Sequence, residues 1–128
     1  MKILIIEDYQ GDVDLLRSRL KTIGCEVVVA MTAEDGFALA VSEQPDMILT
    51  DLNLGEGIDD GIKMLAALRA DDRTAVIPTV LHSVFVSHVQ DMPTVQSQAD
   101  GFLPKPFRFV ELSKLVARFR QAQEGGSR

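Results

Sequence analysis

Short apolar runs alternate with amphipathic segments along almost the whole chain, and this alternation limits the folds available to it. We predict five strands, at residues 2–6, 26–30, 47–50, 77–82 and 101–103. The first three runs are apolar throughout, as parallel strands buried on both faces are. Five β–α units with connections of this length predict an α/β fold, a doubly wound five-stranded parallel sheet.

The segments between the runs carry helix signals. Two of them have apolar residues at helical spacing: Val13, Leu16, Leu20 and Ile23 within residues 12–23, and Phe109, Leu112, Val116 and Phe119 in the last helix. Gly24 provides a stop for the first helix. Thr32 is expected to open a second helix that ends before Pro45, and Asp59 or Asp60 to cap a third.

Two interpretations remain open for residues 84–98, because Pro93 stands where a fourth helix is expected. That helix could end near Asp91, since proline disfavours helical geometry in the residue before it. It could instead begin there, with Asp91 as N-cap and Pro93 in the first turn, where proline is tolerated. We favour the later start.

Composition excludes several classes of function. The chain has 128 residues, a net charge of -6 and a pI near 4.8, without a Lys/Arg cluster, which argues against a nucleic-acid surface. No apolar run approaches the roughly 20 residues of a membrane span, and the N-terminal apolar run is too short for a signal peptide. We therefore expect a cytoplasmic protein without direct nucleic-acid or membrane contacts, in which Cys25 is a buried thiol.

Polar side chains follow four of the predicted strands. Glu7 and Asp8 follow the first strand, Asp51 the third, Ser83 the fourth and Lys105 the fifth. In doubly wound sheets, functional groups gather beyond the carboxyl ends of the strands. Three carboxylates in one place would repel each other and raise their pKa values, and a hard divalent cation such as Mg²⁺ would relieve the conflict.

Four segments, taken together and in order, carry a family resemblance: "ILIIEDY", "MILTDLNL", "VLHS" and "GFLPKPF". They resemble the acidic pair, phospho-acceptor, switch and Lys-Pro segments of response regulator receiver domains, over about residues 2 to 120. The resemblance implies a flavodoxin-like (βα)5 fold with strand order 2-1-3-4-5. It also implies a receiver domain at residues 1–123 with a flexible tail at 124–128, and a phospho-accepting signalling domain of a two-component system rather than an enzyme.

By this resemblance, Asp51 is the phospho-acceptor, and the donor is a sensor histidine kinase or a histidine phosphotransfer protein. The cofactor is Mg²⁺, held by Glu7, Asp8, the Asp51 side chain and the backbone carbonyl of Asn53. A carboxylate acting in this way is a nucleophilic catalyst.

The resemblance also assigns switch roles. Lys105 would pair with one phosphoryl oxygen and Ser83 would donate a hydrogen bond to another, so that Ser83 favours one conformation after phosphorylation. Phe102 would occupy the aromatic switch position, and Lys105–Pro106 would be a cis peptide. His82 is expected to point away from Ser83 and to serve packing, because side chains alternate along a strand.

The sequence is compatible with more than one function. The leading hypothesis is a single-domain response regulator with a downstream protein target, able to form a homodimer on phosphorylation through the apolar run at residues 84–92. The alternative is a receiver-like interaction module that works without phosphorylation. A flavodoxin-like cofactor binder is disfavoured, because the acids of "EDYQGD" would repel a phosphate.

Val84 and Phe85 are expected to shield the phosphoryl group from water.

Overall fold

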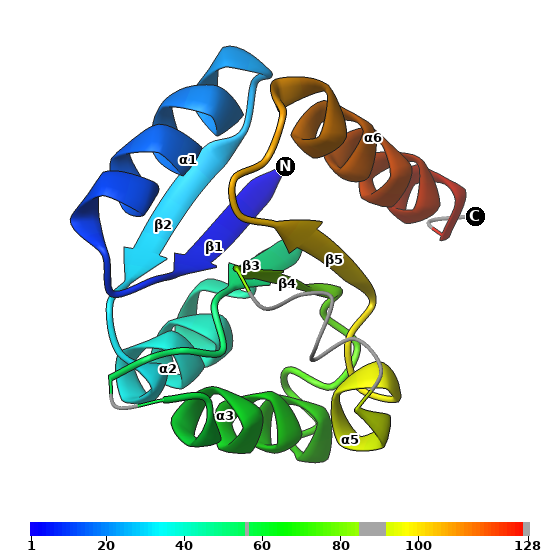
Figure 1. Cartoon of the computed structure of the whole chain (residues 1–128). Coiled ribbons are helices and arrows are strands. Elements are labelled where there is room, and N and C mark those ends of the chain that lie inside the picture. The colour runs from blue at the N-terminus through cyan, green and yellow to red at the C-terminus, as the bar shows by residue number, and fades with distance from the viewer. Residues whose placement is uncertain (56, 85–91, 127–128) are drawn as a thin grey trace.

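The computed structural model describes residues 1–55, 57–84 and 92–126. Its five parallel strands form one sheet in the order β2-β1-β3-β4-β5 (Figure 1). They are β1 (Lys2–Ile6), β2 (Glu26–Ala30), β3 (Met47–Thr50), β4 (Thr79–Ser83) and β5 (Gly101–Pro104). The predicted fold class and strand order are confirmed.

Helices cover both faces of the sheet (Figure 1). Helices α1 (Gln10–Thr22) and α6 (Phe109–Gly126) lie on one face, and α2 (Ala33–Glu43), α3 (Asp59–Ala70) and α5 (Pro93–Gln96) on the other. None of the helices in the described part of the chain combines the length and apolar character that a membrane crossing needs. The two-sided cover explains why the first three predicted strands are apolar throughout.

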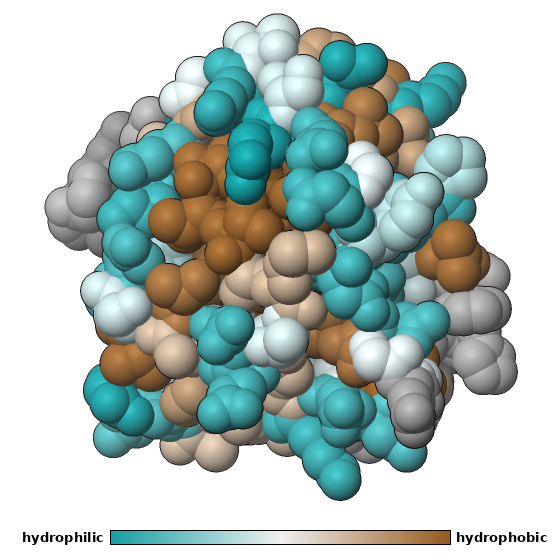
Figure 2. All heavy atoms as spheres, turned by 90° about the vertical axis from the view of Figure 1, so that its left-hand side faces the viewer, coloured by the Kyte–Doolittle hydropathy of each residue, from teal (hydrophilic) through white to brown (hydrophobic). Residues whose placement is uncertain are grey.

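The inner strand β1 contributes to the core on both of its faces. Its residues Ile3 to Ile6 are fully buried, and alternate ones contact the two helical layers. The edge strand β2 is less protected, with Val27, Val28 and Val29 half-buried. Figure 2 looks onto the side where β2 lies and shows an apolar area bordered by hydrophilic side chains. The central strands are thus the rigid base from which the site residues extend.

Two predicted boundaries shift for local reasons. Strand β4 begins at Thr79 rather than at residue 77, because Ile77 donates its backbone N–H to Thr74 in the preceding turn (3.1 Å) and Pro78 has no N–H. Helix α1 begins at Gln10, earlier than the predicted residue 12, with Tyr9 as its N-cap. The earlier start places Asp12 in the first turn of α1.

The predicted helix caps are confirmed in part. The Thr32 hydroxyl accepts a hydrogen bond from the backbone N–H of Asp35 (3.0 Å), and Gly24 follows α1 with a positive φ of 83°. The prediction for α3 is wrong, since its N-cap is Ile58. Asp59 and Asp60 lie inside its first turn, where carboxylates are favoured by the helix dipole.

The last two helices also correct the sequence analysis. Pro93 is the first residue of α5, as in the later start, but the N-cap is Met92 and not Asp91. Asp91 itself, like the rest of 85–91, lies outside the described residues. Helix α6 continues to Gly126, past the expected boundary at residue 123, and Phe109 is 40% exposed rather than buried.

Candidate functional site

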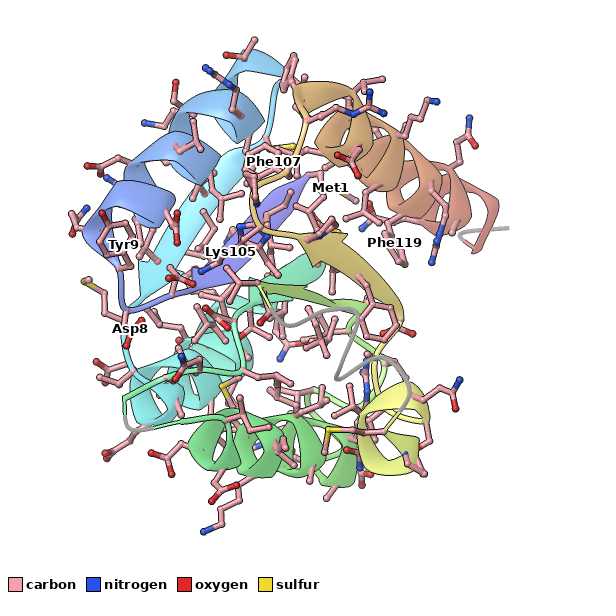
Figure 3. All side chains as sticks on the ribbon, viewed as in Figure 1. Met1, Asp8, Tyr9, Lys105, Phe107 and Phe119 are labelled. Atoms are coloured by element: carbon pink, nitrogen blue, oxygen red, sulfur yellow. The ribbon has the colours of Figure 1, made fainter. Side chains whose placement is uncertain are left out.

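The predicted site residues meet at the carboxyl ends of the strands. Glu7 follows β1 directly, Asp51 follows β3, Ser83 is the last residue of β4, and Lys105 follows β5. In Figure 3 the Lys105 side chain reaches from its segment across the sheet edge toward the first turn of α1. Parallel strands bring these residues together because all their carboxyl ends face the same edge.

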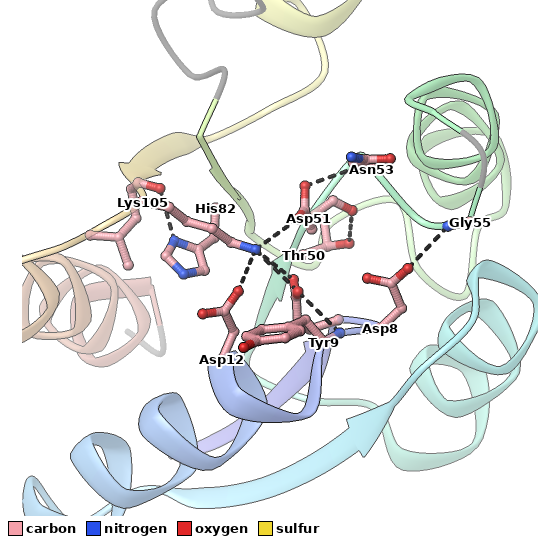
Figure 4. Close-up of polar contacts among 11 residues, drawn as sticks. Asp8, Tyr9, Asp12, Thr50, Asp51, Asn53, Gly55, His82 and Lys105 are labelled. Atoms are coloured by element: carbon pink, nitrogen blue, oxygen red, sulfur yellow. Dashed lines mark hydrogen bonds and ion pairs between the residues drawn. The ribbon is translucent and has the colours of Figure 1, made fainter.

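The ammonium group of Lys105 is the centre of the site (Figure 4). Its Nζ lies 2.8 Å from Asp51 Oδ2, 2.8 Å from Asp12 Oδ2, and 3.1 Å from each carboxylate oxygen of Glu7. The side chains of Glu7 and Asp51 are buried, being 2% and 9% exposed. Lys105 therefore holds three carboxylates from distant parts of the sequence in one cluster.

Three carboxylates face one ammonium, and this excess of negative charge changes the protonation of the cluster. Burial raises the pKa of Glu7, the charge and hydrogen bond of Lys105 lower it, and the charges of Asp51 and Asp12 raise it, with a net rise from 4.5 to about 7. Burial acts to lower the pKa of Lys105, but hydrogen bonds to Asp12 and Asp51 and the charges of Asp51 and Glu7 raise it above its usual value. Lys105 thus stays charged, and Glu7 takes up a proton near neutral pH.

The loop after β3 arranges the second side of the site. Asp51 Oδ1 accepts a hydrogen bond from the backbone N–H of Asn53 (2.9 Å), which orients the carboxylate. Asp8 is exposed and lies outside the Lys105 cluster, because its Oδ2 accepts from the backbone N–H of Gly55 (3.1 Å). Gly55 has a φ of 96°, a conformation that favours glycine and that presents this N–H to Asp8.

Of the predicted switch residues, Ser83 lies on β4, next to the strand that Asp51 follows, and Phe102 lies on β5, one strand further. Ser83 is buried, and its backbone carbonyl accepts from the N–H of Lys105 (3.1 Å), so β4 and the lysine segment are joined directly. Phe102 is half-buried opposite Leu81 and packs against the apolar cluster under α3 and α5. The Lys105–Pro106 peptide is cis, as expected. Val84 is 61% exposed, and Phe85, the second residue of the predicted water shield, is outside the described part of the chain.

Two residues that the sequence analysis assigned to packing are confirmed in that role. His82 is buried, its Nδ1 lies 3.0 Å from the carbonyl oxygen of Leu103, and its ring meets the edge of Phe107 at 5.6 Å. Burial lowers the pKa of His82, which favours a neutral ring that donates from Nδ1. Cys25 is a buried free thiol in the core under α1 and α6. His88 lies outside the described residues.

The donor atoms at this edge suit Mg²⁺ in kind. Asp8, Asp51 and the Asn53 carbonyl would supply oxygen ligands, and Mg²⁺ keeps several waters, so it needs few from the protein. Within residues 1–55, 57–84 and 92–126, no three His, Cys, Asp or Glu side chains form a ready-made metal cluster. Instead, Glu7, Asp12 and Asp51 contact Lys105, and the exposed Asp8 accepts a hydrogen bond from Gly55.

The sequence analysis missed Asp12. It placed this residue at the start of the first predicted helix, at residues 12–23, and gave it no role in the site. An acidic residue four positions after Asp8, in the turn that leaves the carboxyl end of β1, was the available signal. The structure shows that Asp12 contacts Lys105 as closely as Asp51 does.

Comparisons with known proteins identify the family. The model of the response regulator receiver domain matches residues 3–117. The chain is 39% identical, over 93% of its length, to the DNA-binding dual master transcriptional regulator RpaA of Synechocystis sp., and 26% identical, over 88%, to the polar-differentiation response regulator DivK of Brucella anthropi. These matches span 47% of RpaA and 92% of DivK, so the chain covers about half the length of some relatives and nearly all of others.

Solved structures show the same fold. The receiver domain of a sensor histidine kinase from Pseudomonas aeruginosa has a TM-score of 0.82 at 22% identity, covering 92% of this chain and 95% of that one, and it has a magnesium ion coordinated in its active-site cleft. The chemotaxis response regulator CheY4 of Vibrio cholerae has a TM-score of 0.81 at 23% identity, covering 92% and 97%. Fold and family match agree: this chain belongs to the response regulator receiver domains, the signalling modules of two-component systems that differ from classical enzymes.

Proposed function

We propose that this chain is a single-domain response regulator that accepts a phosphoryl group on Asp51 in a magnesium-dependent reaction. The donor is a phosphohistidine of a sensor histidine kinase or of a histidine phosphotransfer protein. The phosphorylated domain then changes its contacts with a downstream protein, or with a second copy of itself. The match to DivK spans 92% of that response regulator, so a chain of this length has a counterpart among the relatives. The proposal places the protein in the cytoplasm, where ATP-dependent kinases obtain their phosphoryl groups.

One observation carries this proposal: the contact of 2.8 Å between Lys105 Nζ and Asp51 Oδ2 at the end of β3. It places a positive charge directly against a nearly buried carboxylate, which is the group that would act as the nucleophile. The same ammonium is in position to meet negative charge that develops beside Asp51. A structural ion pair would satisfy the lysine equally well, but it would not need the acidic neighbours that Asp51 has here.

The chemical step is a phosphoryl transfer between two side chains. A carboxylate oxygen of Asp51 attacks phosphorus, the bond between phosphorus and the donor's imidazole nitrogen breaks, and the nitrogen keeps the electron pair. The product is a mixed anhydride between Asp51 and phosphate. Lys105 donates a hydrogen bond to one phosphoryl oxygen, and the Ser83 hydroxyl donates to another. The second bond favours the conformation in which the Ser83 hydroxyl faces the phosphoryl group.

Asp8, Asp51 and the backbone carbonyl of Asn53 would hold Mg²⁺, with Glu7 acting through water because Lys105 contacts both of its oxygens. When bound, the ion supplies positive charge that offsets the charge of the transferring phosphoryl group. Asp8 would exchange its hydrogen bond to Gly55 for this role. Movement of Ser83 would reach Phe102 through the paired strands β4 and β5.

Intact mass spectrometry after incubation with Mg²⁺ and acetyl phosphate tests the proposal. We expect one added phosphoryl group in the wild type and none in Asp51→Asn, with the reaction suppressed by a chelator and by Asp8→Asn. A wild type that gains no phosphoryl group, or an Asp51→Asn variant that gains one, would refute the assignment. The first result would favour the phosphorylation-independent alternative.

A further inference from the structure

The resting partners of Lys105 leave its ammonium group without spare donors. An ammonium has three N–H donors and no acceptor. Those of Lys105 already face four carboxylate oxygens, two from Glu7 and one each from Asp12 and Asp51, all within 3.1 Å. A phosphoryl oxygen that is to be bound by Lys105 therefore has to compete with these partners.

The negative charge that phosphorylation adds at Asp51 favours the release of one carboxylate partner from Lys105. Phosphorylation replaces the single negative charge of Asp51 with a group that carries about two. The added charge repels the carboxylates that remain beside Lys105 and draws the ammonium toward the phosphoryl oxygens. Asp12 remains a negative charge beside the site.

The exposed fractions of the carboxylate side chains indicate which partner Lys105 releases. The Glu7 side chain is 2% exposed, so a charged Glu7 separated from Lys105 would be stranded in the core. The Asp12 side chain is 29% exposed and can be hydrated again when it leaves. Asp12 also lies in the first turn of α1, where the helix N-terminus favours a carboxylate even without the lysine. Of the three carboxylates, Asp12 has the lowest cost of release.

We propose that Asp12 is a competing partner of Lys105, which the lysine holds in the unphosphorylated protein and gives up when Asp51 carries a phosphoryl group. This inference rests on the proposed function of Asp51. Lys105 keeps its orientation through Glu7 and Asp51, so Asp12 is not needed to place it; Asp12 lowers the affinity of the site for the phosphoryl group. Phosphorylation thereby also changes the first turn of α1, a surface far in sequence from β4 and β5.

The test uses Asp12→Asn, which removes the charge and keeps the shape, and Asp14→Asn as matched control. Asp14 lies on the same helix and carries the same charge, but it is exposed and bonds Gln10 (2.8 Å) instead of Lys105. Beryllofluoride, a phosphoryl mimic, is titrated into each protein in Mg²⁺, with Asp51→Asn as the negative control. Unit charges several ångströms apart at a partly exposed site predict tighter binding by Asp12→Asn, on the order of fivefold to tenfold.

A second readout requires no metal. In a chelator, acylation of Lys105 by an amine reagent, followed by peptide mass spectrometry, reports how closely the ammonium is held. Asp12→Asn should label several-fold faster than the wild type and Asp14→Asn, and Asp12→Glu should restore slow labelling. A change in fold would alter labelling of distant lysines too, such as Lys63 and Lys114, which therefore serve as internal references.

The outcomes separate the two proposals. If the wild type binds beryllofluoride no better than Asp51→Asn does, the proposed function fails and this inference fails with it. If the wild type binds, but Asp12→Asn binds equally well or more weakly than Asp14→Asn, the proposed function stands and the role of Asp12 is refuted. Unchanged labelling of Lys105 in Asp12→Asn also refutes it.

Discussion

The buried carboxyl group of Glu7 lowers the stability of the fold and makes the site sensitive to charge. It is a buried carboxylate directly after β1, and its lysine partner is shared with two other acids. A leucine or glutamine would fit the burial at a lower electrostatic cost. The acid makes the edge of the sheet sensitive to charge, because every added or removed negative charge changes how strongly Glu7 holds its proton.

We expect Glu7 to make stability depend on pH. The pKa of Glu7 in the folded protein, about 7, lies above its ordinary value of 4.5. The contribution of protonated Glu7 to the free energy of unfolding is therefore complete below about pH 4.5 and is lost as the pH rises through 7. A shift from 4.5 to about 7 corresponds to roughly 3–4 kcal/mol in the free energy of unfolding. Urea unfolding in chelator between pH 4.5 and 8 should show this loss in the wild type and not in Glu7→Gln.

Glu43→Gln is the control, since Glu43 pairs with Lys2 at the surface, 3.1 Å away. It should keep the pH dependence of the wild type. If the difference between Glu7→Gln and the wild type is the same at every pH, the pKa of Glu7 does not change on folding and the electrostatic account of the cluster is wrong.

The packing of α3 against the chain after β3 determines where Asp51 and its loop lie. Gly61 is buried in the first turns of α3, directly against the backbone of Leu52. A Cβ atom at Gly61 would overlap the carbonyl oxygen and Cα of Leu52. This close approach lets the helix cover the segment next to the phospho-acceptor, and it is possible only with glycine.

Gly61→Ala tests this contact. Alanine favours a helix by up to about 1 kcal/mol over glycine, but overlap with backbone atoms cannot be relieved by a side-chain rotation. We expect the overlap to win, with a net loss of about 1–3 kcal/mol in the free energy of unfolding, measured by urea denaturation.

Gly101→Ala provides the comparison, because a Cβ there would lie 3.5 Å from the side chains of Leu115 and Val80, an ordinary contact. It should cost clearly less than Gly61→Ala. A Gly61→Ala protein as stable as the wild type would mean that α3 can move away from Leu52.

At the scale of the molecule, Arg69 connects the layers around β4 and β5. From α3, its guanidinium donates to the carbonyls of Gln98 (2.7 Å), Ala75 (3.0 Å) and Ile77 (2.8 Å), and it pairs with Asp100. Asp100 in turn accepts from the backbone N–H of Thr79 (2.8 Å). One side chain thus joins α3, the turn before β4 and the turn before β5.

Arg69→Lys should lower the free energy of unfolding by about 2 kcal/mol, because a lysine has one nitrogen and cannot serve three carbonyls and a carboxylate at once. Thermal or urea unfolding measures the change. Arg73→Lys should have little effect, since Arg73 is largely exposed and pairs locally with Asp71. Equal effects of the two substitutions would show that Arg69 does not join the layers.

The amino-acid sequence by itself determined the fold class and the main members of the site. Alternating apolar runs and helical stripes are local patterns, and a parallel sheet places every strand's carboxyl end at one edge, so Asp51, Ser83 and Lys105 could be brought together without coordinates. Thr32 and Gly24 could be assigned as helix signals for the same reason, since their effect acts within one turn of the chain.

Only the tertiary structure decided which acids meet the lysine. Asp8 and Asp12 are both near the end of β1, yet Asp8 turns to Gly55 and Asp12 to Lys105. That choice depends on where α1 begins, on the register of β1 against β3, and on the path of the chain after β5. A periodic pattern carries none of these quantities, because they are set by the packing of segments up to 98 residues apart.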